Sequence, residues 1–561
     1  MSLLITFLTT LKNFVKLQDG NGLRSWLLIE SNVSESYYQL SRELKSGFQN
    51  SSAIEKLVDK CLPEEDDVPE GMGSPYPGFN TFIREYLEYW RDVDFNDVVN
   101  IHARVSGLLI SCANALAHPT YGIMLLQTSM SLSESLSKLV MQLNREPRLL
   151  AQIQGGSYGV ESGERKSIVE LAADIIQKIF TACLTDRSST RDSVPKGKKV
   201  AVYLFANLTL KLLFACDKSR LAVQMFTNLS SSGPLLSLYP ASQRVTFLYY
   251  LGRFNFDHCH YLRAHWSFEE AYRQCPPRFM KHRRQILTYW IPSSLLMGRF
   301  PSQTLLQRPE ARGFADIFIP ICAAVRTGNF VAFQNAMAQN KDWLWAKGLY
   351  LTLLQRLKPL VWRSFTRKTF LLTSQQDDAS GQFSSNNRAP ALALQDLVTT
   401  ASYVQRLLEG YLPARPAPRA RPAPHINTIF LKAVTNSAAA EGAESNSTLA
   451  PPPGGPRQLM PSEGLIFANQ KPTIDKVEGI VAGLVYAGLL NGFIARQQRK
   501  FAIEGAKKQG GNAVRAGWPN PYGSIMERFR EDYEESMSLY ETDDGDPPGD
   551  FDDVPGWVRH V

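Results

Sequence analysis

The chain has 561 residues, 44% of them hydrophobic and 20% charged, which are the proportions of a globular protein with room for two to four domains. No run of 18 consecutive apolar residues occurs, so the sequence predicts no membrane span. The net charge of +8 is unevenly placed. Residues 526–561 hold 12 acidic and 3 basic residues, and the preceding 525 residues therefore carry +17. A basic body favours a polyanionic partner such as nucleic acid, and the alternative is a solvated surface that keeps the protein soluble.

The seven cysteines indicate reduced thiols of a cytosolic or nuclear protein. Their number is odd, they lie in apolar segments, and no two form a C-x-x-C pair. At the N-terminus, MSLLITFLTTLKNFVK has no basic residue before its apolar part and no cleavage site of small residues. We therefore expect a packing helix there rather than a signal peptide.

Residues 1–199 are expected to form an N-terminal helical region, because their apolar residues recur at helical spacing. Further apolar stripes cover 124–143, 168–183 and 200–216, and polar loops are expected at 61–78, 153–166 and 186–199. The clearest stripe comprises Phe79, Phe82, Ile83, Tyr86, Leu87 and Trp90.

Residues 200–373 read as a helical repeat. Within 249–300, Ala264 and Ala271 are small enough to let a neighbouring helix approach closely. Gly252-Arg253-Phe254 and Gly298-Arg299-Phe300 are interpreted as one turn signal repeated after 46 residues. Repeats of helix–turn–helix units in this length range are typical of solenoids, in which each unit buries its apolar face on its neighbours. Such a pattern favours a scaffold over a catalytic pocket.

The composition changes at residue 374. Residues 374–471 are rich in Gly, Ser, Ala and Pro, and include PARPAPRARPAP at 413–424. Segments of this kind bury little apolar surface, so we expect a largely disordered insertion. Two apolar islands lie within it, 391–412 and 426–435, and the insertion is expected to carry one or two helices that dock.

Residues 472–515 show the pattern of a winged helix. Thr473 is placed to cap a helix whose apolar face is Val477, Ile480, Val481 and Leu484, and Gly488 is placed to end it. Asn491-Gly492 signals a turn, and 493–503 has apolar ends around a polar, basic tip. A helix, a turn and a basic two-stranded ribbon are the closing elements of a winged helix.

The chain resembles the PCI-domain family, whose domain occurs in the proteasome lid, the signalosome and a translation initiation factor. The segments that carry the resemblance are LGRFNFDHCHYLRAHWSFEEAYRQC, RRQILTYWIPSSLLMGRFPSQTLLQRPE, RTGNFVAFQNAMAQNKDWLWAKGLYLTLLQRLKPLVWRSF and IDKVEGIVAGLVYAGLLNGFIARQQRKFAI. Within the family it is most similar to the PCI subunit of the transcription–export complex TREX-two. The signalosome-subunit-twelve-like proteins are the sister group.

The resemblance implies a mainly α fold: a right-handed helical-repeat solenoid that ends in a small α/β winged helix. The long insertion departs from the compact family pattern and leaves the first helix of the module to be assigned; HINTIFLKAVT (425–435) is the candidate.

The implied function is a non-enzymatic scaffold subunit of a nuclear complex that couples transcription to mRNA export. It would pair with a large scaffold subunit and with a small acidic disordered subunit shared with the proteasome lid. Its location would be nuclear, at or near the nuclear pore, with the cytoplasm as a further location. The alternatives are a signalosome-twelve-like subunit linked to splicing, and a purely structural scaffold that binds no nucleic acid.

The best candidate site is the basic end of the winged helix. Clustered Lys and Arg neutralise phosphates and bind RNA or DNA without reading sequence, and two glutamines can add hydrogen bonds. The alternatives are a surface that contacts a partner protein only, because winged helices of this family pair with each other, and a solubilising loop. The candidate residues are Lys471, Lys476, Arg496, Gln497, Gln498, Arg499, Lys500, Lys507, Lys508 and Arg515.

A second basic cluster lies before an apolar helix and suits an acidic, aromatic peptide. The resemblance supplies such a partner in the small acidic subunit. The cluster consists of Arg278, Lys281, His282, Arg283 and Arg284.

The sequence predicts no metal, no cofactor and no catalytic residue. His258 and His260 are two positions apart, so on a helix they would point in different directions. Metalloprotease relatives in the family have an aspartate eleven residues after the second histidine of H-x-H, where this chain has Ala271. Phosphate-loop and nucleophile-elbow motifs are also missing from the sequence.

Residues 516–561 are expected to be an acidic C-terminal tail. Aspartates and glutamates are interleaved there with Tyr533, Tyr540, Phe551 and Trp557. Such a segment, tethered to a basic body, is expected to compete with polyanions for the basic surface; a plain solubilising tail is the alternative.

Overall fold

The computed structural model describes residues 3–48, 50–62, 76–146, 148–149, 166–379, 390–413 and 449–540. The chain divides into two compact units, of which one contains Met1–Ile286 and the other Leu287–Asp546. The division falls inside one helix, α14 (Met280–Leu296).

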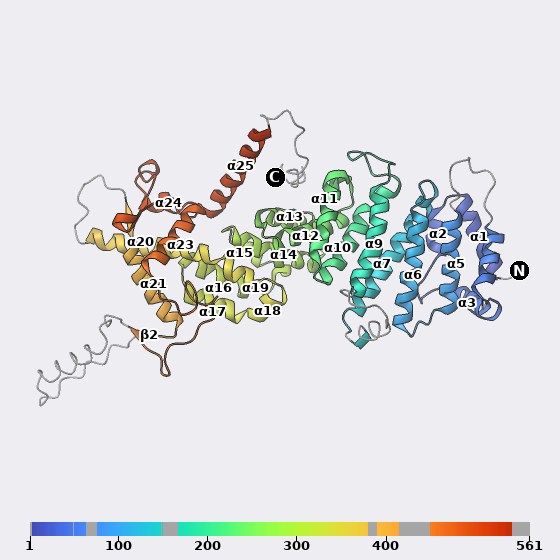
Figure 1. Ribbon diagram of the computed structural model, residues 1–561, viewed down its shortest axis with the longest axis horizontal. Helices are drawn as coiled ribbons and strands as arrows, with labels where there is room; N and C mark the ends of the chain where they lie inside the picture. Colours follow the sequence, from blue (N-terminus) through green and yellow to red (C-terminus); the bar gives the residue numbers. More distant parts are fainter. Residues whose placement is uncertain are drawn as a thin grey trace, which may run out of the picture. The chain divides into compact units, whose positions relative to one another are not determined.

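The first unit is built from helices that pack mainly on their neighbours in sequence. α5 packs on α6, α6 on α7, α9 on α10 and α12 on α13, and Figure 1 shows α5 to α10 following one another side by side. The α-helices are α1 (Leu3–Lys16), α2 (Gly20–Trp26), α3 (Glu35–Gly47), α4 (Ser51–Cys61), α5 (Tyr76–Asp92), α6 (Val98–Leu116), α7 (Leu126–Leu143), α9 (Ile168–Leu184), α10 (Val202–Ala215), α11 (Val223–Ser232), α12 (Ala241–Asp257) and α13 (Tyr261–Gln274). The 3-10 helices are η1 (Tyr121–Leu125), η2 (Gly197–Ala201), η3 (Ser219–Ala222) and η4 (Leu236–Leu238).

The predicted apolar stripe of 79–90 forms the buried face of α5. All six of its residues are at most 1% exposed, because spacings of three, four and seven place them on one side of the helix. The polar tips of its aromatic residues are paired: the Tyr86 hydroxyl and the Trp90 indole N–H both donate to the Leu28 carbonyl, at 2.6 and 3.2 Å. The stripe therefore buries large rings without leaving their polar groups unpaired.

The interpretation of Gly252-Arg253-Phe254 as a repeated turn is wrong. Gly252 lies inside α12, whereas Gly298 follows α14 with φ +75°. A Cβ on Gly252 would approach the Phe268 ring to 2.7 Å, so the glycine allows α13 to pack closely on α12. Ala264 and Ala271, predicted to lie at such a crossing, are fully buried. The glycine is thus required by helix packing rather than by a turn.

The second unit contains the part of α14 from Leu287 onward, further helices and a three-stranded sheet. Its α-helices are α15 (Gln303–Leu306), α16 (Phe314–Thr327), α17 (Phe330–Gln339), α18 (Lys341–Ala346), α19 (Tyr350–Arg356), α20 (Lys358–Ala379), α21 (Leu394–Leu408), α23 (Ile474–Tyr486), α24 (Ala513–Gly517) and α25 (Pro521–Tyr540). The 3-10 helices are η5 (Pro309–Ala311), η6 (Arg496–Gln498) and η7 (Lys507–Gln509). The strands are β1 (Ala391–Ala393), β2 (Leu412–Pro413), β3 (Leu449–Ala450), β4 (Gly492–Ala495) and β5 (Lys500–Ile503).

A winged helix is formed by α20, β1, α21, α23, β4 and β5, in chain order. The sheet has the order β1-β5-β4, and all of its pairings are antiparallel. α21 packs on both α20 and α23 (Figure 1). The fold is therefore mainly α with a small α/β winged helix, as the sequence predicts.

The winged helix begins earlier in the chain than the sequence indicated. β1 and α21 fall within residues 374–471, the range assigned to an insertion, yet β1 pairs with β5 and α21 packs on α23. The helix that precedes the first strand is α20, and the candidate 425–435 lies outside the described residues. The pairing of residues 391 and 502 is invisible to local patterns, because it joins segments more than 100 residues apart.

Part of the expected insertion is held against the helices. β2 pairs with β3, with Pro413 opposite Leu449. Beyond them, the Gln405 side chain, 2% exposed, donates to the Ala468 carbonyl at 3.0 Å and accepts from the Leu465 amide at 3.0 Å. The Lys358 ammonium donates to the Gly464 carbonyl at 3.0 Å. We call residues 457–470 the strap.

Candidate nucleic-acid interface

The helix of the candidate interface is α23, and its limits follow the predicted signals. Val477, Val481 and Leu484 are buried, and Ile480 is half-buried. The helix ends at Tyr486, and Gly488 takes the left-handed conformation (φ +64°) that commonly ends helices. Thr473 occupies the N-cap position, but its side chain makes no capping hydrogen bond.

The wing is the hairpin of β4 and β5. Gly492 pairs with Ile503 at its open end and Ala495 with Lys500 at its tip. Residues 496–499 turn the chain, and Arg499 takes a left-handed conformation (φ +52°). On the inner side, Phe501 and Ile503 are buried, and the Arg499 carbonyl accepts from the Leu394 amide at 2.9 Å. The buried side fixes the hairpin and leaves its tip in solvent.

The structure gathers five of the ten predicted residues at this tip. We call residues 496–500 the wing tip. Its members are all exposed: Arg496, Gln497, Gln498, Arg499 and Lys500. Exposed cations next to one another can neutralise successive phosphates without a preformed pocket.

An ion pair links the wing tip to α23. The Arg496 Nε is 2.9 Å from Oε1 of Glu478, which lies in the second turn of the helix. The Arg496 side chain is nonetheless 86% exposed, so the pair contributes only about 0.2–1 kcal/mol and leaves the guanidinium accessible. Lys476, half-buried, and Lys471, exposed, are at the same N-terminal end of α23.

The other three predicted residues lie away from the tip. Lys507 and Lys508 are exposed on η7, which follows the open end of the hairpin, and Arg515 is exposed on α24. A four-residue strand spans about 13 Å, so these cations are at the opposite end of β5 from the wing tip. The ten residues therefore form two groups rather than one surface.

Sequence reasoning missed the composition of the exposed face of α23. In helix-turn-helix proteins the corresponding helix enters the major groove of DNA. Here its exposed positions carry no cation and no amide, and a Cβ added at either glycine would meet nothing within 4 Å. Spacings of three, four and seven residues could have revealed the face. Its members are Asp475, Gly479, Ala482, Gly483 and Tyr486.

The predicted cluster 278–284 begins in the turn after α13, with Arg278, and continues into the N-terminal part of α14, within the first unit. Arg278, Lys281, His282 and Arg284 are exposed, whereas Arg283 is half-buried. The Arg283 guanidinium lies 4.0 Å from the centre of the Tyr272 ring, so this residue also packs against α13.

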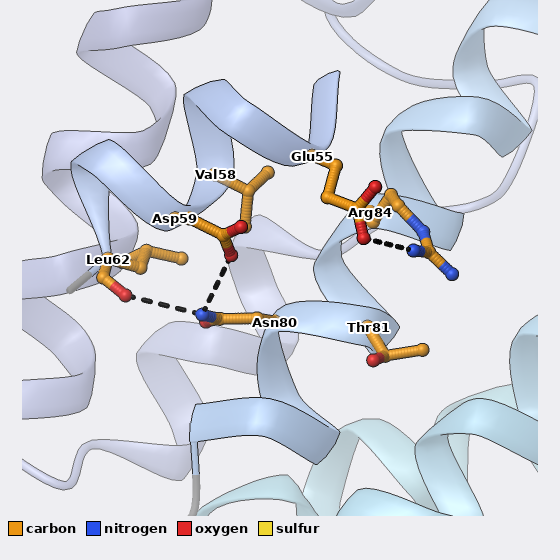
Figure 2. A pocket seen from close by; sticks show the side chains of 7 residues that line it. All are labelled: Glu55, Val58, Asp59, Leu62, Asn80, Thr81 and Arg84. Carbon is orange, nitrogen blue, oxygen red and sulfur yellow. Dashed lines mark hydrogen bonds and ion pairs between the residues drawn. The ribbon is translucent and has the colours of Figure 1, made fainter. Parts of the chain in front are cut away.

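A hollow of about 440 Å³ between α4 and α5 offers a different kind of site (Figure 2). Arg84 pairs with Glu55 at 3.0 Å, and the Asn80 amide donates to Asp59 Oδ1 and to the Leu62 carbonyl at 3.4 and 3.3 Å. These groups largely satisfy each other, and the arrangement lacks a nucleophile beside a base.

His258 and His265 have separate surroundings. His258 caps the end of α12, and buried His265 has its Nε2 3.5 Å from Glu269. Within the described ranges, no group of three or more His, Cys, Asp or Glu side chains could hold a metal ion. Nor is any helix in the described part of the chain long and apolar enough to cross a membrane.

Comparison with known proteins finds relatives of this chain. No family model matches the chain. A PCI domain-containing protein of Schizosaccharomyces pombe is 26% identical over 374 residues, which are 66% of this chain and 79% of that protein. A CSN12 homologue of Neurospora crassa is 32% identical over 224 residues, 39% of this chain and 48% of that protein. The chain is similar to PCI-domain proteins.

The same similarity extends to animal members of the family. A PCI domain-containing protein 2 homologue of Drosophila melanogaster is 28% identical over 217 residues, 38% of this chain and 52% of that protein. The match thus spans about half the length of two of these three relatives. The predicted resemblance to the PCI family, with signalosome-twelve-like relatives, is confirmed, and a PCI scaffold subunit is the role that it suggests. The resemblance to TREX-two is not confirmed.

Proposed function

We propose that this protein is a non-enzymatic PCI scaffold subunit of a nuclear complex for transcription-coupled mRNA export, and that it binds nucleic acid through its wing. The observation that carries the proposal is the wing tip: Arg496, Arg499 and Lys500 stand exposed on a hairpin whose other side is buried. A fixed group of cations at the end of a rigid hairpin is suited to phosphates.

The proposed mode of binding is contact with the backbone of RNA or DNA, without reading of base sequence. The exposed face of α23 carries Asp475 and small residues where base-reading side chains would be needed. The wing tip, by contrast, offers cations and the amides of Gln497 and Gln498. Affinity would then depend strongly on salt and little on sequence.

The proposed partners are a large scaffold subunit of the export complex and the small acidic subunit shared with the proteasome lid. The first contact is supported by β4, which pairs with β5 on one side, and whose other edge pairs with no strand among the described residues. Phe493 on this strand is 57% exposed. An open edge with an exposed ring suits the pairing of two winged helices. The acidic subunit and the nuclear location rest on the family resemblance.

A second candidate function is a signalosome-twelve-like subunit linked to splicing, which is favoured by the CSN12 homologues among the relatives. Affinity purification of the full-length protein followed by mass spectrometry separates the two functions. Recovery of a large export scaffold supports the first, and recovery of splicing factors without that scaffold supports the second.

The wing is tested by changing Arg496, Arg499 and Lys500 together to Ala and titrating a labelled duplex against salt. Removing three phosphate contacts should reduce the slope of log K against log salt by about 2.7, at about 0.9 for each contact. The control replaces Lys507 and Lys508, which lie at the other end of the hairpin, and should change the slope less. An unchanged slope in a folded triple variant would contradict binding through the wing and favour the alternative, a purely structural scaffold that binds no nucleic acid.

A further inference from the structure

The turn between α13 and α14 presents an aromatic ring among cations. Pro276 and Pro277 restrict the backbone here, the Phe279 amide donates to the Pro276 carbonyl at 3.1 Å, and the Phe279 carbonyl accepts from the Arg283 amide at 3.1 Å. Phe279 is thus held in a closed turn that leads directly into α14. We call Arg278, Phe279, Met280, Lys281, His282 and Arg284 the Phe279 cluster.

The side chains of this cluster combine apolar surface with positive charge. Phe279 is 43% exposed and Met280 is 51% exposed. The Arg278 guanidinium lies 4.8 Å from the centre of the Phe279 ring, and the His282 ring meets Phe279 edge-on at 6.1 Å. A phenyl ring next to a guanidinium is a combination on which a flat, electron-rich group can stack.

The sequence around the cluster is basic. Between Glu270 and Glu310 the chain contains no Asp or Glu. Glu270 itself pairs with Arg273 at 2.5 Å. The cluster therefore has an unusually positive sequence environment, which attracts polyanions.

We propose that the Phe279 cluster is a second nucleic-acid contact, which binds a single strand by stacking one base on Phe279 while Arg278, Lys281 and Arg284 contact phosphates. The cluster lies in the first unit and shares no residue with the wing, so the inference goes beyond the proposed function. It predicts that single strands are bound even by a protein without the wing cations.

Single-stranded nucleic acid fits the cluster better than the acidic peptide expected from sequence. A specific protein interface buries about 800 Å² on each partner, and Phe279 and Met280 offer only two apolar side chains. Stacking of one base requires only one ring and contributes about 1–3 kcal/mol.

The test measures the affinity of the full-length protein for a labelled 20-nucleotide oligouridine by fluorescence anisotropy. It is made in two backgrounds: one has the wing intact, and the other has Arg496, Arg499 and Lys500 changed to Ala. In both backgrounds Phe279→Leu should weaken binding about fivefold or more, and Phe279→Trp should preserve it, because only an aromatic ring stacks. Phe279 is partly exposed, so both variants should fold, which circular dichroism checks.

Charge is tested by a matched pair of double reversals. R278E/K281E should weaken oligouridine binding about tenfold at low salt. K218E/R220E, which changes the net charge equally at two exposed positions, the N-cap residue of η3 and a residue within it, should weaken it less than twofold. Equal losses in the two pairs, or unchanged affinity of Phe279→Leu, would overturn the proposal. A third outcome would also overturn it: a labelled Glu/Tyr peptide competes with oligouridine, and its affinity is unchanged by Phe279→Leu. That result would mean that the cluster binds an acidic protein. If changing Arg496, Arg499 and Lys500 has no effect on nucleic-acid binding but the Phe279 variants behave as expected, the proposed function is refuted and this inference still holds.

Discussion

The indole Nε1 of Trp518 donates a hydrogen bond to Oγ1 of Thr366 at 3.1 Å, and both residues are buried. The bond joins α20 to the segment that follows β5, 152 residues later in the chain. Arg363, one turn earlier on α20, donates to the Trp518 and Pro519 carbonyls at 2.9 and 2.5 Å. Burial lowers the pKa of Arg363 to about 10. These contacts attach the segment that follows the winged helix to α20, its first helix.

Changing Thr366 to Val should lower the free energy of unfolding by about 1–3 kcal/mol, because the buried Trp518 N–H would lose its acceptor at nearly constant side-chain volume. Thr373→Val, on the same helix, serves as the control. The Thr373 hydroxyl bonds only the backbone of its own helix, so its loss should cost much less. Urea denaturation of the two variants measures the difference, and equal midpoints would contradict the role of the bond.

Gln405 is expected to hold the strap. Gln405→Leu would leave the buried Leu465 amide without its acceptor and the Ala468 carbonyl without its donor, and should cost about 2–5 kcal/mol. The matched control is Gln395→Leu, at an exposed position of the same helix, which should be nearly neutral. Limited proteolysis should cut residues 457–470 faster in the first variant only. Identical cleavage rates would mean that the strap does not depend on Gln405.

His102 on α6 gives the stability a pH dependence. Burial lowers the pKa of His102 below its ordinary value of 6.5, so the folded protein binds fewer protons here than the unfolded chain. The stability from this residue is therefore present above pH 6.5 and falls as the pH drops towards the lowered pKa. His102→Gln should remove this part of the decrease. Denaturant midpoints at pH 7.5 and 5.5 compare the two proteins, and the same pH dependence in both would exclude His102 as its source.

The role of the tail is tested by truncation, and the truncated protein must keep the contacts of α25. A cut after Tyr522 would remove Arg528, whose guanidinium bonds the Tyr486 carbonyl, and would leave Tyr522, which lies 4.8 Å from the Arg299 guanidinium, at the new chain end. A stop after Tyr540 keeps these contacts and removes seven acidic residues and one arginine, all outside the described residues.

This truncation should tighten oligonucleotide binding at low salt and should have little effect at high salt, because screening weakens the competition. The control keeps the tail but replaces its seven Asp and Glu residues by Asn and Gln; it should bind as tightly as the truncated protein. Equal affinity of the wild-type and truncated proteins at low salt would contradict competition by the tail and favour the alternative, a tail that only keeps the protein soluble.

The sequence by itself determined the elements whose signals are local. The buried stripe of α5 follows from apolar spacing, and Gly488 ends α23 because glycine accepts the left-handed conformation. The basic wing tip was also predictable, because a polar turn between two short apolar stretches is complete within about ten residues. These features need no knowledge of distant parts of the chain.

Only the tertiary structure decided how distant segments combine. The pairing of Ala391 with Ala502 depends on contacts across more than 100 residues, and so do the bond from Trp518 to Thr366 and the docking of the strap on Gln405. Gly252 shows the same limit, since its turn-like sequence lies within a helix where Phe268 occupies the space of a side chain. Local patterns report on the preference of a segment, whereas the partner that buries it is fixed by packing in the folded chain.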